Sequence, residues 1–76
     1  MDWQERVVID SKIRFGKPTI KGTRIAVTDI LSLLADGYTI FRILEYYPHL
    51  HEEDIKAAVK YAISAIDLEN VIVSDG

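Results

Sequence analysis

The chain of 76 residues contains no cysteine, so neither a disulfide nor a thiolate zinc site can stabilise it. A chain of this length holds one domain with a small hydrophobic core. Association with another protein is then the natural way to bury more apolar surface. We therefore expect a single domain over residues 1–76 that forms a homodimer or docks onto a partner.

Long hydrophobic runs are also missing. No apolar run approaches the roughly 20 residues that a membrane span requires. The first residues, from Met1 to Arg6, lack the basic and then apolar layout of a signal peptide. We expect a cytoplasmic protein that makes no contact with a membrane.

Acidic residues are absent from one stretch of the chain. The net charge of −3 argues against a surface that is basic all over. Between Ser11 and Thr28, however, five basic residues occur without an acidic one, namely Lys12, Arg14, Lys17, Lys21 and Arg24. We predict that these five side chains bind a partner or a nucleic acid. The alternative is a solvated edge that lysines protect from strand pairing.

The first third of the chain, residues 1–27, reads as extended. Residues 6–9 are β-prone, and residues 19–20 and 24–27 flank a tight turn in which Gly22 supplies a positive φ. Two or three short strands are expected here.

Residues 28–66 show the apolar spacing of three helices. The first is expected over residues 29–36, with Thr28 as N-cap and Gly37 just beyond its end. The second is expected over residues 40–46, capped by Thr39 and stopped by Pro48. The third covers residues 52–66, and residues 67–76 form a short tail in which Val71–Val73 is a β-prone docking strand. The fold class is mainly α, a tri-helical helix-turn-helix domain with a short extended or β N-terminal segment.

In such a domain the third helix usually reads DNA. Here the third helix would present Glu52, Glu53 and Asp54 to the DNA. These three carboxylates would repel the phosphates. Acidic residues at a helix start also have an ordinary role, because they complement the helix dipole. If DNA is bound, the basic segment is the better candidate.

Residue patterns for catalysis and for cofactors are missing. The run from Gly16 to Arg24 lacks the glycine and lysine order of a phosphate loop. His49 and His51 are not spaced as ligands of a helical zinc site. No nucleophile stands in a catalytic context. We expect no enzyme, no metal, no cofactor and no small-molecule substrate.

Small residues on the third helix would let another helix approach closely. The residues expected at a dimer or partner interface are Ala58, Tyr61, Ala62, Ala65, Val71 and Val73. The aromatic residues Phe41, Tyr46, Tyr47 and Tyr61 are expected to pack in the core or in an interface. The pattern assigns no core role to Trp3.

A set of residues spread over positions 9–62 forms a combined pattern, namely Gly16-Lys17-Pro18, Ile20, Gly22-Thr23-Arg24-Ile25, Val27, Leu34, Gly37, Ile43-Leu44, Tyr47-Pro48, Leu50, Asp54-Ile55, Ala57-Ala58 and Tyr61-Ala62. In these residues the chain resembles family 433 of domains of unknown function, whose members are regarded as predicted antitoxins of bacterial toxin–antitoxin pairs. The resemblance implies a homeodomain-like helical domain and a toxin partner that looks like a PIN-domain ribonuclease. The chain departs from the family at His51, where serine or threonine is common, and near Ser11 and Lys12, where a proline is common.

PIN nucleases hold Mg²⁺ with a cluster of carboxylates, so a basic side chain inserted into the cleft can neutralise them. Arg24 can also bind backbone carbonyls or a carboxylate of its own fold. Our hypothesis is that Lys17, Lys21 or Arg24, or the tail at residues 71–73, blocks such a toxin. A DNA-binding regulator without a toxin and a pure dimerisation adaptor are the alternatives, and an antitoxin can also bind its own operator DNA.

Overall fold

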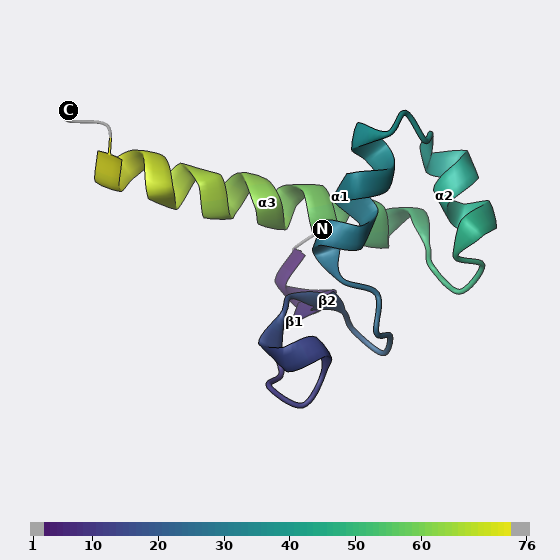
Figure 1. Cartoon of the computed structure of the whole chain (residues 1–76), viewed down its shortest axis with the longest axis horizontal. Helices are drawn as coiled ribbons and strands as arrows, with labels where there is room; N and C mark the ends of the chain where they lie inside the picture. The colour runs from purple at the N-terminus through teal and green to yellow at the C-terminus, as the bar shows by residue number, and fades with distance from the viewer. Residues whose placement is uncertain (1–2, 74–76) are drawn as a thin grey trace.

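The structure, a computed structural model, describes residues 3–73 and is mainly α, as expected (Figure 1). Two short 3-10 helices and two strands precede three α-helices. In chain order the elements are η1 (Trp3–Glu5), β1 (Val7–Val8), η2 (Arg14–Gly16), β2 (Thr19–Ile20), α1 (Val27–Ala35), α2 (Ile40–Tyr46) and α3 (Glu52–Val73).

The N-terminal third forms a small antiparallel ribbon, which confirms the extended segment. Val7 of β1 lies opposite Ile20 of β2, and Thr19 forms an isolated bridge with Ala26. The expected turn follows β2, where Gly22 has a φ of 81° and the Thr23 N–H donates to the Ile20 carbonyl at 3.0 Å. The ribbon brings the chain back to the start of α1.

Helix α1 begins at Val27 and its N-cap is Ala26, so the prediction that Thr28 caps it is wrong. Alanine has no side-chain acceptor. The Asp29 carboxylate, in the first turn, accepts the Ala26 N–H at 3.0 Å instead. The C-terminal end is as predicted, because Gly37 has a φ of 93° and the N–H groups of Gly37 and Tyr38 donate to the carbonyls of Leu34 and Leu33.

Helix α2 has the predicted bounds, and the Thr39 hydroxyl accepts the Arg42 N–H at 3.1 Å. Helix α3 is longer than predicted. It continues to Val73, so the expected tail at 67–73 and the docking strand at 71–73 are both corrected to helix. No glycine or proline interrupts residues 52–73, so nothing in the chain stops the helix after Ile66.

The core lies where the ribbon, α1 and α2 meet the first half of α3. Its buried apolar residues are Val7, Ile20, Val27, Ile30, Ile43, Leu50, Ile55, Ala57 and Ala58. Ala58, one of the residues expected at a partner interface, is fully buried in this core. Trp3 does have a core role, since its ring meets that of Tyr61 edge to face at a centroid distance of 5.1 Å.

The C-terminal half of α3 extends away from the rest of the molecule (Figure 1). Ile63 and Ile66 lie there with 53% and 55% of their surfaces exposed. Ala62 and Ala65 are half-buried, whereas the side chains of Val71 and Val73 lie outside the described part of the chain. Within the described residues, no helix has both the length and the apolar character to cross a membrane.

Candidate partner-binding surface

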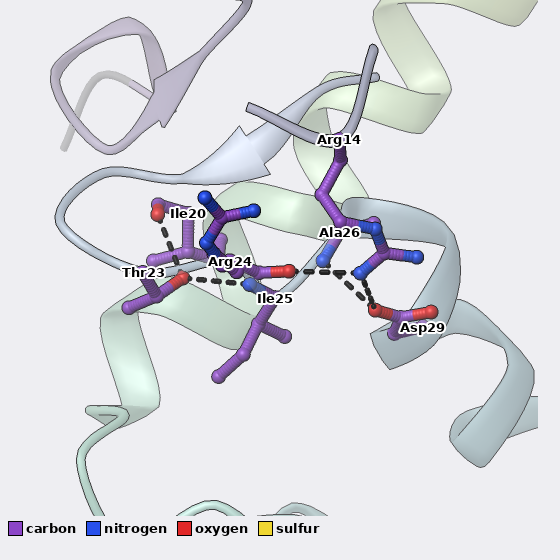
Figure 2. Close-up of polar contacts among 7 residues, drawn as sticks. All are labelled: Arg14, Ile20, Thr23, Arg24, Ile25, Ala26 and Asp29. Carbon is purple, nitrogen blue, oxygen red and sulfur yellow. Dashed lines mark hydrogen bonds and ion pairs between the residues drawn. The ribbon is translucent and has the colours of Figure 1, made fainter. Parts of the chain in front are cut away.

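Arg14, one of the five predicted binding residues, is engaged within the chain. Its Nη1 donates to the Asp29 carboxylate at 3.1 Å and to the Arg24 carbonyl at 2.8 Å (Figure 2). The same Asp29 oxygen accepts the Ala26 N–H at the start of α1. Arg14 therefore fixes the η2 loop to the first helix, and its predicted role in binding stays a prediction.

Arg6 is used in a similar way at the start of α3. Its Nη1 donates to Asp54 at 2.9 Å, and the other Asp54 oxygen accepts the His51 N–H at 2.8 Å. Asp54 is only 6% exposed. A buried carboxylate needs such hydrogen-bond and charge partners. In the same turn, the exposed Glu52 pairs with Lys56 at 3.2 Å. These contacts support the view that the acidic cluster stabilises the helix start.

The other four basic side chains, those of Lys12, Lys17, Lys21 and Arg24, are exposed. Among the residues whose side chains are described, no hydrogen bond or ion pair engages any of these four side chains. Arg24 uses its carbonyl to hold Arg14, while its guanidinium points away from Asp29 (Figure 2). We call these four residues the basic surface. Its four charged groups therefore remain available to an acidic partner.

The turn that carries Lys21 and Arg24 has a fixed shape. The Thr23 hydroxyl donates to the Ile20 carbonyl at 2.8 Å and accepts the Ile25 N–H at 3.0 Å (Figure 2). Two more backbone bonds hold the turn, because Ile20 donates to the Ile25 carbonyl at 2.9 Å and Lys21 to the Arg6 carbonyl at 2.8 Å. A fixed turn loses little backbone entropy on binding.

The η2 loop contains three consecutive residues with positive φ, namely Arg14 at 52°, Phe15 at 59° and Gly16 at 83°. The left-handed conformation costs about 1–2 kcal/mol for an ordinary residue. Phe15 lies at the tip of this loop and is 100% exposed. Sequence reasoning overlooked Phe15, although an aromatic residue beside glycine in a basic stretch was the available signal.

A hollow of about 610 Å³ separates the basic turn from the start of α3. Its lining combines Lys21 with the capped helix start, and consists of Glu5, Arg6, Lys21, Gly22, Thr23, His49, His51 and Asp54. Charges of both signs line it. Among the residues whose side chains are described, no three His, Cys, Asp or Glu side chains lie together as metal ligands would.

Aromatic residues gather on and beside α2. Phe41 and Tyr46 are 69% and 60% exposed, so they do not pack in the core of this chain. The Tyr46 and Tyr47 rings meet at 4.8 Å, and the Arg42 guanidinium lies 6.0 Å from the Tyr38 ring centroid. Burial raises the pKa of Tyr47, the charge of Asp29 and the neighbouring Tyr46 raise it further, and Arg14 lowers it.

Residues 7–62 match the family described as "Protein of unknown function (DUF433)". The chain belongs to this family. The match covers most of the chain, including the ribbon, α1, α2 and the core half of α3. No solved structure matches it.

Two DUF433 relatives are uncharacterised proteins. One is the protein y4eO of Sinorhizobium fredii, which is 37% identical over 59 residues, or 78% of this chain and 27% of that protein. The other, from Archaeoglobus fulgidus, is 70% identical over 43 residues, or 57% of this chain and 97% of that protein. The chain thus spans about a quarter of the Sinorhizobium protein and nearly all of the Archaeoglobus one.

Proposed function

We propose that this DUF433 protein is a cytoplasmic antitoxin that binds and neutralises a PIN-like ribonuclease, and that it acts by binding rather than by catalysis. The observation that carries the proposal is the basic surface. Lys12, Lys17, Lys21 and Arg24 have no carboxylate partner within the described chain, while Arg6 and Arg14 hold their segment in place. The resemblance to antitoxins supplies the nuclease as the partner.

The proposed mechanism is electrostatic. A nuclease cleft that holds Mg²⁺ with carboxylates attracts cations, and a guanidinium pairs with a carboxylate in a bidentate geometry. Arg24 stands on a turn that its neighbours already fix, so little order has to be gained when it enters such a cleft. Occupying the cleft displaces the metal or the RNA.

The first test is the capture of the tagged protein from its host, with the co-purifying proteins identified by mass spectrometry. A PIN-like nuclease found this way is then purified, and its RNA cleavage is measured with and without the DUF433 protein. Arg24→Ala is expected to weaken the complex by about tenfold or more, as loss of an interfacial charge pair does. Arg42→Ala, an exposed arginine on α2, is the matched control and leaves affinity within about twofold.

An unchanged affinity of Arg24→Ala, with the fold intact, would remove Arg24 from the mechanism. Absence of any nuclease from the captured proteins, together with no effect of the protein on RNA cleavage by a purified PIN-like nuclease, would refute the antitoxin function.

Binding to DNA is the second candidate, because the same four cations can contact phosphates. It requires the ribbon as the contact, since Asp54 at the start of α3 is buried and Glu52 and Glu53 repel phosphate. Affinity for DNA would fall steeply as salt is added, with a slope set by the number of phosphates that are neutralised. A titration of duplex DNA at several salt concentrations tests for this binding, and salt-sensitive binding without any captured nuclease favours the regulator over the antitoxin.

A further inference from the structure

Phe15 is a large apolar side chain that the fold leaves wholly in water. It is 100% exposed, and its backbone adopts φ 59° and ψ 33°, which a bulky residue rarely occupies. The side chain therefore adds nothing to the core, and its backbone conformation is unfavourable. The fold itself thus gives no reason for phenylalanine at this position.

The loop holds Phe15 in this conformation through contacts on both sides. The Ile13, Gly16 and Lys17 N–H groups donate to the carbonyls of Asp10, Ile13 and Arg14 at 2.8, 3.1 and 3.1 Å. Arg14, directly before Phe15, is bound to Asp29 and to the Arg24 carbonyl. The backbone that carries the phenyl ring is thus already ordered. Little conformational entropy has to be lost when the ring binds a partner.

The charges beside Phe15 specify the partner. Lys12 and Lys17 flank it in the chain, both exposed and both without an ion pair in the described residues. An apolar anchor within a basic rim is complementary to an apolar pocket within an acidic rim.

We propose that Phe15 is the anchor of the complex and enters an apolar pocket, bordered by carboxylates, on a partner protein. This inference rests on the proposed function in that the partner is the PIN-like nuclease. It adds that the contact extends beyond the metal-binding carboxylates to an apolar pocket beside them.

A nucleic acid is the less suitable occupant. A phenyl ring can wedge between base pairs, and lysines can contact phosphate. The start of α3, however, carries Glu52 and Glu53, and these carboxylates repel phosphate where a helix-turn-helix domain would meet DNA. DNA is therefore an outcome that the experiment has to detect.

The chain offers a direct readout, because Phe15 and Phe41 are its only phenylalanines. Protein labelled with 4-fluorophenylalanine gives two ¹⁹F resonances, and Phe41→Gln assigns them. On addition of the purified nuclease, the Phe15 resonance is expected to move and to lose its solvent isotope shift between H₂O and D₂O. Phe41, which is 69% exposed on α2, is the internal control. Its resonance is expected to keep its chemical shift and its solvent isotope shift.

A substitution separates anchoring from folding. Phe15→Asn removes the ring and places a residue that tolerates the left-handed conformation, so its unfolding midpoint equals or exceeds that of the wild type. Affinity for the nuclease is expected to fall at least about 30-fold, as for an anchor residue. Phe15→Leu, which keeps an apolar group, is expected to lose less.

Each other outcome overturns the inference in a distinct way. Equal affinity of Phe15→Asn and the wild type refutes the anchor and leaves the antitoxin function standing. A nuclease that does not bind the wild type refutes both. A Phe15 resonance that responds to a DNA duplex but not to the nuclease assigns the ring to a wedge in DNA.

Discussion

Gly37 ends α1 with a φ of 93°, and a Cβ built on it would meet no atom within 4 Å. Space is therefore available for a side chain, and only the backbone conformation resists one. We expect Gly37→Ala to lower the free energy of unfolding by about 1–2 kcal/mol, the cost of a left-handed residue. Urea unfolding measures this loss.

Gly37→Asn is the matched variant, because asparagine tolerates the left-handed region better than alanine. It is expected to lose less stability than Gly37→Ala. Equal stability of Gly37→Ala and the wild type would mean that the left-handed conformation at position 37 costs alanine little at the end of α1.

Tyr47 gives the stability of the fold a dependence on alkaline pH. Its pKa in the folded protein is raised above the ordinary 10.0, first by burial and then by Asp29 and Tyr46. The folded state thus holds the phenol proton more tightly than the unfolded state does. This contribution to stability is complete below pH 10.0 and is lost as the pH rises through the folded pKa.

Between about pH 9 and about pH 11, one unit on either side of the ordinary tyrosine pKa, the free energy of unfolding of the wild type should therefore fall. In Tyr47→Phe it should fall by less. Urea unfolding at the two pH values measures the difference. Equal falls in both proteins would show that Tyr47 does not cause the dependence.

Helix bounds followed from the sequence where local chemistry sets them. Thr39 caps α2 and Gly37 ends α1 as predicted, because a hydroxyl acceptor and a positive φ are properties of single residues. The cap of α1 was missed because Asp29, three positions into the helix rather than at the N-cap, accepts the free N–H. The end of α3 was missed because β-branched residues at 71–73 favour a strand only when a sheet is there to receive them.

The C-terminal half of α3, which projects from the domain, predicts that two copies of the chain associate. Ile63 and Ile66 are exposed on a helix that projects from the domain, and two such helices can cover each other's apolar residues (Figure 1). We expect light scattering after gel filtration to give twice the chain mass of 8.6 kDa. Ile63→Glu combined with Ile66→Glu should return the mass to that of the monomer.

Lys60→Glu is the control for this prediction, since it changes the charge of an exposed residue on the same stretch without removing apolar surface. A dimer should also unfold at a temperature that rises with protein concentration. A wild type that is monomeric at high concentration would exclude α3 as a self-interface and would contradict the homodimer expected from the sequence.

At the scale of the whole molecule, two arginine–aspartate pairs join the N-terminal segment to the helices. Arg14 meets Asp29 at the start of α1, and Arg6 meets Asp54 at the start of α3, 48 positions along the chain. The sequence revealed the basic stretch and the acidic helix starts. It could not assign partners across such separations, because the six cations of residues 1–27 and several carboxylates allow many pairings. For that reason the pattern does not reveal that Arg14 pairs with Asp29, nor that this pair holds the loop on which Phe15 is exposed.

The Arg6–Asp54 pair should be the more costly one to break. Arg6→Met leaves a carboxylate that is 6% exposed and that keeps, within the described chain, the hydrogen bond from the His51 N–H. Because Arg6 is itself about one third exposed, we expect a loss of about 1–3 kcal/mol rather than the larger cost of a fully buried pair. Arg42→Met, which breaks the exposed pair with Glu45, should cost no more than about 0.5 kcal/mol.

Asp54→Asn, combined with Arg6→Met, tests the cause of that loss. The amide oxygen can still accept the His51 N–H, but a neutral group no longer needs a counter-ion. The double variant should therefore recover part of the stability that Arg6→Met loses, and urea unfolding of the four proteins gives the coupling free energy. If the double variant is instead less stable than Arg6→Met by the full cost of Asp54→Asn, the two residues act independently, and packing of the Arg6 side chain rather than its charge joins the ribbon to α3.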